Sequence, residues 1–325
     1  MSDLRASAAP AGAGVLAVDA GQTGTKMRLI VSGEGPRELT RPGIRTDKPL
    51  MPQVADAARA LRAEAATPFE VLAVGASGLV DPDADAEELL RLAADLGVER
   101  VLLAHDSITS FLGSLGDVQG AVVAAGTGVV TLAVGRTRVV RVDGWGNIMG
   151  DAGSAYWIGR EALDVAMRAY DGRSSATALT DVMRERWPDL ESAYIDLQSD
   201  ADRVRVVASF AEAVTELAAT DAAASQISLR AARELSLSVL TGLSRVLEST
   251  EPAVVGMVGG VFRSSTIRSR FEELVAESRP DVRFLMPHGS GLDGVAALLA
   301  LREGHPLTSL IAVAENSART GCTDE

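Results

Sequence analysis

Cysteine is almost absent from this sequence. Cys322 is the only cysteine in 325 residues. A single thiol excludes a disulfide framework within the chain and any metal site built from cysteines alone. Because proteins of reducing compartments do not rely on disulfides, we expect a cytoplasmic protein.

Aromatic residues and long apolar runs are also scarce. Phe, Trp and Tyr make up 4% of the chain although 47% of its residues are hydrophobic, so Ala, Val, Leu and Gly must fill the core. No apolar run approaches the roughly 20 residues that cross a bilayer. Residues 1–13 lack the apolar centre of a signal peptide. We expect a soluble protein with a disordered leader over residues 1–13.

Basic residues are outnumbered, with 31 Lys and Arg against 44 Asp and Glu and a formal net charge of −13. Nucleic acids and anionic membranes attract clustered positive charge, so this balance argues against both as partners. A nucleotide is still compatible with it, because Mg²⁺ and backbone N–H groups neutralise phosphates without a basic surface.

Two segments share one pattern of strand, small-residue turn and strand. The first is VLAVD at 15–19, followed by AGQTGT and the run KMRLIVSG; the second is GAVVAAGTGVVTLAVG at 120–135. Each reads as a β-hairpin with a glycine-rich turn. Two copies about a hundred residues apart predict two lobes built on one plan.

Strands and helices alternate around these hairpins. We expect a helix near 53–66, a strand from Val71, a helix over about 85–97, a strand VLLAHD and a helix after Asp106. A helical region over about 200–248, a strand at 253–260 with a following helix, and a closing strand, turn and helix complete the chain. This alternation predicts an α/β fold. We expect an N-terminal lobe at 14–114, a C-terminal lobe at 115–314, whose last helix could pack back on the first lobe, and a flexible tail at 315–325.

The first glycine-rich turn has the composition of an anion site. It does not match a P-loop or a dinucleotide fingerprint, because both of those open a helix and this turn leads into a strand. A tight hairpin instead lets backbone N–H groups and Thr hydroxyls approach a phosphate, with Asp19 placed to hold hydrated Mg²⁺. An ordinary hairpin turn explains the segment equally well.

Two later segments also have a structural and a functional interpretation. Gly259 and Gly260 end a strand before a helix, which suits either a flat adenine ring or a plain turn. Asp106 follows a strand and begins a helix. It is therefore either an N-cap or a catalytic base at the carboxyl end of a strand, and capping is the safer interpretation from this segment alone.

The segment from Gly144 to Gly159 is the most specific in the chain. It reads GWGNIMGDAGSAYWIG and resembles the GWGH-x-x-GDEGSAYWIG signature of N-acetylglucosamine kinases. With both hairpins and the paired glycines in order, the chain resembles the N-acetylglucosamine kinase and BadF/BadG-type ATPase family of the sugar kinase/actin/Hsp70 superfamily. The resemblance covers about residues 15–301 and implies two ribonuclease-H-like, actin-like lobes with an ATP cleft between them.

The resemblance also implies roles for individual residues. Asp106 becomes the base that takes a proton from the 6-hydroxyl of the sugar, and Asp19 serves Mg²⁺. The implied contacts to ATP are Gly21, Gln22, Thr23, Gly24, Thr25, Lys26, Gly126, Thr127, Gly128, Gly259 and Gly260. The implied sugar-site residues are Thr46, Asp47, Ser77, Gly78, Asp106, Trp145, Gly146, Asn147 and Asp151. Trp145 has the alternative of a packed core residue.

Two departures from the family pattern concern the acceptor. The His that follows GWG in the family is Asn147 here, and the early sugar loop, which usually carries Asn, reads GIRTDKP at 43–49. A carboxylate at Asp47 suits a free amine, as in glucosamine, better than an acetamide. The alternative is a surface ion pair of Asp47 with Arg45 or Lys48.

The expected function is ATP-dependent phosphorylation of an amino sugar, first of all N-acetylglucosamine, with glucosamine or another hexose as alternatives. A BadF-type activator would need cysteine ligands for an iron–sulfur cluster, and the chain has one cysteine. A sugar sensor without turnover is the third alternative, although the chain shows no basic recognition helix. A homodimer is expected only because homodimers are common.

Overall fold

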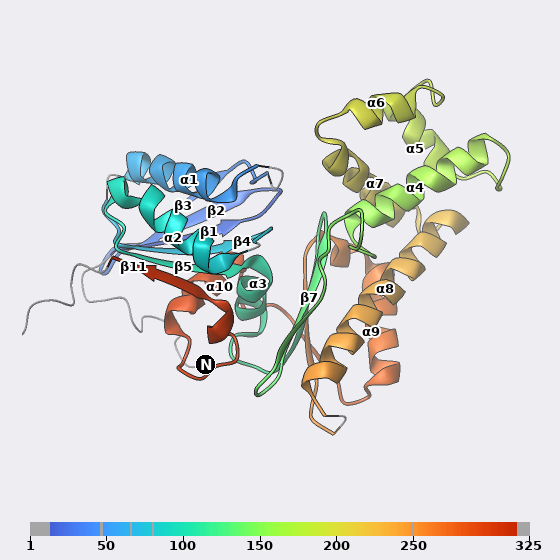
Figure 1. Cartoon of the computed structure of the whole chain (residues 1–325). Helices are drawn as coiled ribbons and strands as arrows, with labels where there is room; N and C mark the ends of the chain where they lie inside the picture. The colour runs from blue at the N-terminus through green and yellow to red at the C-terminus, as the bar shows by residue number, and fades with distance from the viewer. Residues whose placement is uncertain (1–13, 46–47, 66, 80, 249, 317–325) are drawn as a thin grey trace, which may run out of the picture. The chain divides into compact units, whose positions relative to one another are not determined.

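The computed structural model describes residues 14–45, 48–65, 67–79, 81–248 and 250–316. The chain divides into two compact units (Figure 1). The first runs to Val118 and resumes at Pro287, and the second is Gln119–Met286. None of the described helices combines the length and the apolar character that crossing a membrane requires.

The first unit is built on a six-stranded mixed sheet of order β11-β5-β4-β1-β2-β3. β1 pairs with β4 in parallel and with β2 in antiparallel orientation, so the first predicted hairpin is confirmed. The strands are β1 (Val15–Ala20), β2 (Thr25–Ile30), β3 (Arg37–Arg41), β4 (Val71–Ala76), β5 (Arg100–His105) and β11 (Ala312–Glu315). The helices are α1 (Leu50–Ala65), α2 (Pro82–Leu92), α3 (Asp106–Leu115) and α10 (Gly291–Ala297).

Helices cover both faces of this sheet (Figure 1). The side chains of α1 and α2 share one apolar core with β1 and β4 residues such as Leu16 and Leu72. On the other face α3 packs closely against α10. A methyl group at Gly294 would lie 1.7 Å from the carbonyl oxygen of Thr109, so this approach requires glycine.

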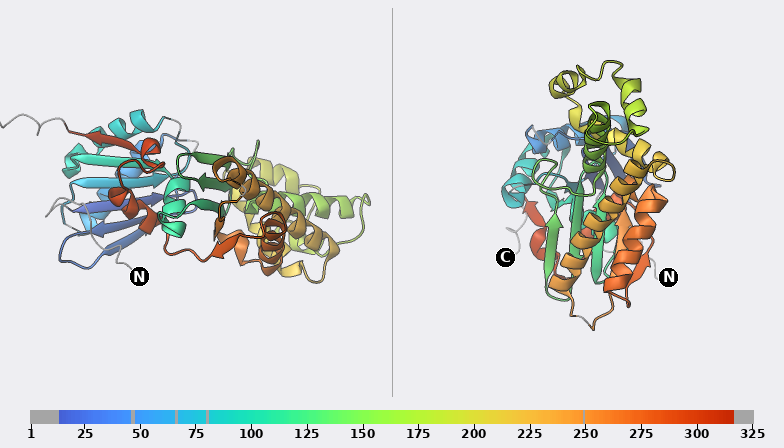
Figure 2. Two further views of the ribbon diagram at one scale, coloured as in Figure 1. Left: turned by 90° about the horizontal axis from the view of Figure 1, so that it is seen from below. Right: turned by 90° about the vertical axis from the view of Figure 1, so that its right-hand side faces the viewer.

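The second unit has a five-stranded sheet of order β10-β9-β6-β7-β8. Its strands are β6 (Gly120–Ala125), β7 (Val129–Val134), β8 (Val139–Asp143), β9 (Val254–Val258) and β10 (Arg283–Leu285). Its helices are α4 (Ala155–Tyr170), α5 (Leu179–Arg186), α6 (Ala193–Ser199), α7 (Arg203–Leu217), α8 (Ala222–Val246) and α9 (Ser265–Ser278). α8 crosses the sheet and lies beside α9 (Figure 2), while α4 packs on α7.

The two sheets repeat one topology. The order β5-β4-β1-β2-β3 in the first unit corresponds strand by strand to β10-β9-β6-β7-β8 in the second. In both, an antiparallel hairpin is extended on one side by an antiparallel strand and on the other by two parallel strands. The predicted pair of lobes on one plan is therefore confirmed.

Several expected boundaries differ from the structure. The sequence assigned 287–314 to the C-terminal lobe and allowed its last helix to pack back on the first lobe. The helix α10 does pack on α3, and because β11 also pairs with β5, the whole segment from Pro287 belongs with the first unit. Glu315, expected in the tail, is the last residue of β11. The helical region at 200–248 is two helices, because Asp221 caps α8 through the N–H groups of Ala223 and Ala224. The expected leader (1–13) and the rest of the tail (317–325) lie outside the described residues.

Candidate functional site

The backbone that follows β3 packs against the turn of the first hairpin. The Gly21 N–H donates to the Gly24 carbonyl at 3.1 Å, and the Ile44 N–H donates to the Gly21 carbonyl at 3.0 Å. A methyl group at Gly43 would lie 2.0 Å from the Gln22 carbonyl oxygen. The backbone after β3 therefore lies directly against the turn and fixes its position.

The predicted ATP contacts of the first hairpin, residues 21–26, lie partly in this turn and partly in β2. Gln22 and Thr23 are exposed in the turn. Thr25, expected in the turn, is instead the first residue of β2 and is only 2% exposed, whereas Lys26 lies in β2 as the predicted run KMRLIVSG implies. Lys26 is exposed and lies opposite Asp19 in the β1–β2 register. The structure thus brings this lysine to the carboxylate that the sequence assigned to Mg²⁺.

Asp19 is a poorly solvated carboxylate near the end of β1. Burial, reinforced by repulsion from Asp106 and opposed by Lys26, raises the pKa of Asp19 to about 6. A methyl group at Gly291 would lie 2.4 Å from its Oδ2, so the absence of a side chain there leaves space for the carboxylate. A cation would relieve the cost of keeping this group ionised.

Asp106 is not the N-cap of α3. That position belongs to His105, whose Nδ1 accepts from the Ser107 N–H at 3.2 Å. Asp106 is the first helical residue, directly after the parallel strand β5. The capping interpretation, which the sequence favoured locally, is wrong because the preceding imidazole fills the role.

The two carboxylate oxygens of Asp106 have different surroundings. Oδ2 accepts a hydrogen bond of 2.5 Å from the Ser77 hydroxyl, which follows β4. Oδ1 is buried and lies 2.9 Å from His105 Nδ1. While Nδ1 accepts from Ser107 it has no proton to donate, so among the described residues Oδ1 then lacks a hydrogen-bond donor. Only the protonated imidazole makes this contact an ion pair.

The environment keeps Asp106 ionised. Burial acts to raise the pKa of Asp106, but the interactions with His105, with the Ser77 hydroxyl and with the Ser107 backbone outweigh it and lower the pKa. The result is an ionised carboxylate whose Oδ2 is held by Ser77 and whose Oδ1 faces His105.

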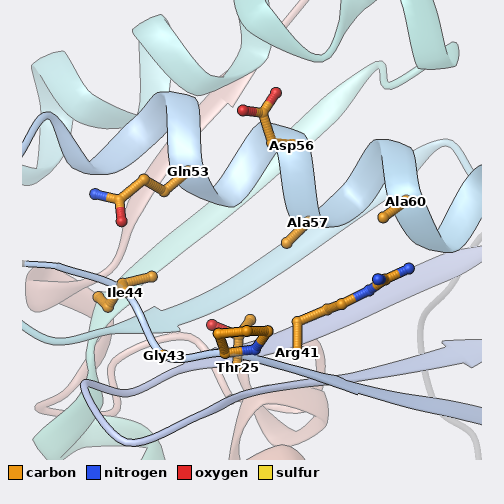
Figure 3. A pocket seen from close by; sticks show the side chains of 9 residues that line it. Thr25, Arg41, Gly43, Ile44, Gln53, Asp56, Ala57 and Ala60 are labelled. Carbon is orange, nitrogen blue, oxygen red and sulfur yellow. The ribbon is translucent and has the colours of Figure 1, made fainter.

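The expected sugar loop is anchored to α1 by one side chain. Gln53 accepts from the Arg45 N–H at 2.9 Å and donates to the carbonyls of Arg45 (3.0 Å) and Pro49 (2.9 Å). Thr46 and Asp47 lie outside the described residues, so the Asp47 hypotheses stay untested. Figure 3 shows Gln53 on the wall of a hollow of about 230 Å³ between α1 and the end of β3. Its lining includes Thr25 but no other predicted site residue.

The second hairpin turn rests on the start of α4. The Gly126 N–H donates to the Gly128 carbonyl at 2.9 Å. The Ala155 N–H donates to the Gly126 carbonyl (2.8 Å), and the Tyr156 N–H donates to the Thr127 carbonyl (3.1 Å). A methyl group at Gly128 would lie 2.7 Å from Asp151 Oδ2, so this turn and the GDAGS segment form one surface.

Asp151 is held by a second carboxylate. Its N–H donates to Asp143 Oδ1 at 2.9 Å, and the same oxygen accepts from the Gly144 N–H at 2.8 Å. Both aspartates have positive φ, 60° for Asp143 and 61° for Asp151. Burial and then repulsion from Asp143 raise the pKa of Asp151 to about 6, although the N–H groups of Val129 and Gly146 oppose the shift.

The loop before Asp151 is exposed. Trp145 is 56% exposed, so the alternative of a packed core residue is wrong. The Arg141 guanidinium stacks over its ring, 4.5 Å from the centroid. Gly146 is exposed and Asn147 half-buried in the same loop, and Gly78 is exposed in the first unit beside Ser77.

The two adjacent glycines, Gly259 and Gly260, differ in the space available for a side chain. Gly259 has φ +105°, and a methyl group there would lie 2.2 Å from the Ala125 carbonyl oxygen, so strand packing explains it. Nothing lies within 4 Å of a methyl group at Gly260. The space beside the backbone is therefore open at Gly260.

Sequence reasoning missed four residues that position the others: His105, Gln53, Gly43 and Asp143. Only His105 could have been identified from the sequence, because it directly precedes the predicted helix and so occupies the N-cap position. Gln53 and Asp143 each bond to backbone eight residues away as well as to nearer backbone, and Gly43 lies against Gln22 of the first turn. No local pattern marks such contacts.

Comparison with known proteins places these features in a family. The model of the BadF/BadG/BcrA/BcrD ATPase family matches residues 16–300. The chain is 25% identical over 214 residues to the N-acetylmuramic acid/N-acetylglucosamine kinase of Clostridium acetobutylicum, covering 61% of this chain and 66% of that protein. It is 39% identical over 75 residues to the N-acetyl-D-glucosamine kinase of Dictyostelium discoideum, covering 23% and 24%. Each match thus spans less than two thirds of the relative.

A solved structure matches over a longer range. A Chromobacterium violaceum protein assigned as an N-acetylglucosamine kinase superposes with a TM-score of 0.69 at 24% identity, covering 90% of this chain and all of that chain. This similarity confirms the expected actin-like sugar-kinase fold. Because the family model matches residues 16–300, most of the chain and a range that includes Asp106 and the GDAGS segment, the chain belongs to the BadF/BadG/BcrA/BcrD ATPase family.

Proposed function

We propose that this protein is an ATP-dependent kinase that phosphorylates the 6-hydroxyl of an amino sugar, with N-acetylglucosamine as the first candidate. Glucosamine or another hexose is the alternative acceptor. The names of the two curated relatives support the choice of an amino sugar.

The observation that carries this proposal is the state of Asp106. Its Oδ2 is fixed by Ser77, and its buried Oδ1 has no donor while His105 is neutral. A sugar hydroxyl within hydrogen-bond reach would supply that donor and pass its proton to Oδ1 as the oxygen attacks phosphorus. The hydrogen bond from Ser77 to Oδ2 favours the ionised carboxylate, which is the form that can accept the proton.

The hairpin turns suit the phosphates of ATP. Glycines at 21, 24, 126 and 128 keep these turns free of bulky side chains, so that backbone N–H groups not bonded within the turn can approach a phosphate, and Lys26 adds a positive charge. Asp19 fits Mg²⁺, because its buried carboxylate lacks a compensating cation other than Lys26 among the interactions that shift its pKa. When bound, Mg²⁺ would neutralise charge on the transferred phosphoryl group.

In the second unit, the surface around Asp151 suits sugar hydroxyls. A carboxylate accepts hydrogen bonds from neighbouring hydroxyls, and the exposed ring of Trp145 offers an apolar face. Gly146 and Asn147 complete this part of the proposed sugar site.

The first test is ADP release with ATP and Mg²⁺ against N-acetylglucosamine, glucosamine, N-acetylmannosamine, N-acetylmuramic acid and glucose. We expect sugar-dependent turnover, highest with N-acetylglucosamine. A preference for glucosamine would instead support the role of Asp47 in binding an amine. Folded, ATP-binding protein that releases no ADP with any of these sugars would contradict the kinase proposal and favour a sensor.

Replacing Asp143 with Asn is expected to shift the pH dependence of sugar binding. Because the pKa of Asp151 is raised, its carboxylate is ionised only above about pH 6, and sugar affinity should fall as the pH drops through that value. Removing the charge of Asp143 lowers the pKa of Asp151 and moves this fall to lower pH. Asn retains the acceptor oxygen for both N–H groups and tolerates the positive φ.

Calorimetric titration of sugar without nucleotide or Mg²⁺, from pH 4.5 to 8, measures this shift. Asp164→Asn is the matched control, since that half-buried aspartate lies on α4 and pairs with Arg168. An unchanged pH profile in Asp143→Asn would remove Asp151 from the proposed sugar site.

A further inference from the structure

The start of α10 lies against Asp19, the carboxylate proposed for Mg²⁺. A methyl group at Gly291, the first residue of α10, would lie 2.4 Å from Asp19 Oδ2 and 3.2 Å from Oδ1. The φ of Gly291 lies outside the positive range, so its own backbone conformation does not require glycine. The neighbouring carboxylate does, because a side chain at this position would displace it.

Asp293 ties this end of α10 to the sheet that carries Asp19. Its Oδ2 accepts hydrogen bonds from the Ser290 N–H at 2.6 Å and from the Ser290 hydroxyl at 2.8 Å. Its Oδ1 accepts from the guanidinium of Arg28 in β2, also at 2.6 Å. The Arg28 side chain is 19% exposed and donates in turn to Glu38 of β3 at 2.7 Å. Since β2 is the hairpin partner of β1, Asp293 links the start of α10 to the strand pair that holds Asp19.

The helix that begins with Asp106 fixes the same segment on its other side. The Gly289 N–H donates to the carbonyl of Gly113 in α3 at 2.8 Å. A methyl group at Gly113 would lie 2.2 Å from the Ser290 carbonyl oxygen, so the two backbones are in close contact. The residues before Gly291 are therefore held both by the sheet, through Asp293, and by α3.

We propose that Asp293 is a positioning residue for metal binding: it holds Gly291 against Asp19 and so fixes the place of the carboxylate that binds Mg²⁺. This inference rests on the proposed function, in which Asp19 serves Mg²⁺. Asp293 bonds to Arg28 and Ser290, so its effect on Asp19 passes through the backbone of α10. Groups that orient a metal ligand without binding the metal typically contribute about 10- to 100-fold to metal affinity.

The test measures the Mg²⁺ affinity of the protein–ADP complex without sugar and without turnover. Calorimetric titration of ADP at increasing concentrations of free Mg²⁺ is made for wild type, Asp293→Asn and Asp19→Asn. We expect Asp293→Asn to weaken Mg²⁺ binding by about 10-fold, because its amide nitrogen replaces one acceptor oxygen and the contacts with Arg28 and Ser290 cannot both persist. Asp19→Asn gives the scale for loss of the carboxylate itself.

Asp95→Asn is the matched control. Asp95 is an exposed aspartate of the first unit that also bonds to an arginine, Arg59, with distances of 3.0 and 3.2 Å. Its loss removes the same charge and a comparable ion pair away from Asp19, and Mg²⁺ affinity should equal that of wild type.

Gly291→Ala tests the same contact from its other side, with Asp293 intact. The added methyl group should displace the Asp19 carboxylate and weaken Mg²⁺ binding by at least 10-fold. Gly35→Ala, where nothing lies within 4 Å of the methyl group, should bind Mg²⁺ as wild type does. Urea denaturation shows which variants are folded, and Gly291→Ala decides the matter if Asp293→Asn does not fold.

The outcomes separate this inference from the proposed function. Wild-type Mg²⁺ affinity in folded Asp293→Asn, or an equal loss in Asp95→Asn, would overturn the role of Asp293. Wild-type affinity in Asp19→Asn would overturn it together with the metal role of Asp19, and turnover of the sugars would still decide the kinase proposal. Absence of turnover with every sugar would overturn the kinase proposal, and the ADP titrations would still decide the role of Asp293.

Discussion

Asp106→Asn is expected to lower kcat for sugar phosphorylation by about 10³-fold, within the range that general-base catalysis contributes. The amide keeps the shape of the side chain and its contact with Ser77, but it has no carboxylate oxygen to take the proton of the acceptor hydroxyl. Sugar and ATP should still bind. Coupled ADP-release kinetics measure the loss of kcat, and calorimetry measures the retained binding.

Asp83→Asn is the matched control for this change. It replaces an exposed aspartate in the first turn of α2, so it removes the same charge from the same unit away from the site. Its kcat should equal that of wild type. A folded Asp106→Asn variant with more than a tenth of wild-type kcat would show that Asp106 is not the base.

Gly43→Ala is expected to displace the turn of the first hairpin and lower kcat/KM for ATP by at least 10-fold. The added methyl group would lie 2.0 Å from the Gln22 carbonyl oxygen, and backbone cannot rotate aside as a side chain does. Displacing a phosphate-holding turn by a fraction of an ångström is costly because phosphoryl transfer depends on positioning. Overpacking should also destabilise the fold by about 1–3 kcal/mol.

Gly35→Ala distinguishes this effect from a general cost of replacing glycine. Nothing lies within 4 Å of a methyl group at Gly35, and its φ lies outside the positive range. Urea denaturation gives the free energy of unfolding of both variants, and ATP titrations are made where each is folded. Wild-type KM for ATP in Gly43→Ala would show that the contact with Gln22 does not position the turn.

The predictions from sequence that succeeded rest on signals carried by neighbouring residues. Both hairpins were found because alternating apolar residues and a glycine-rich turn are local signals, and the repeated topology of the two sheets follows from them. The GDAGS segment was found as a continuous motif. Asp106 was placed correctly at a strand end, yet its expected local role belongs to its neighbour His105.

The sequence by itself determined the α/β alternation, the two hairpins and most of the residues proposed for the site, because strand period and turn chemistry act over a few residues. Tertiary structure alone decided what those residues contact. Gln53 holds backbone at Arg45 and Pro49, Gly43 meets Gln22, and Pro287 onward returns to the first unit. Such contacts join segments separated along the chain, and packing rather than local pattern selects them.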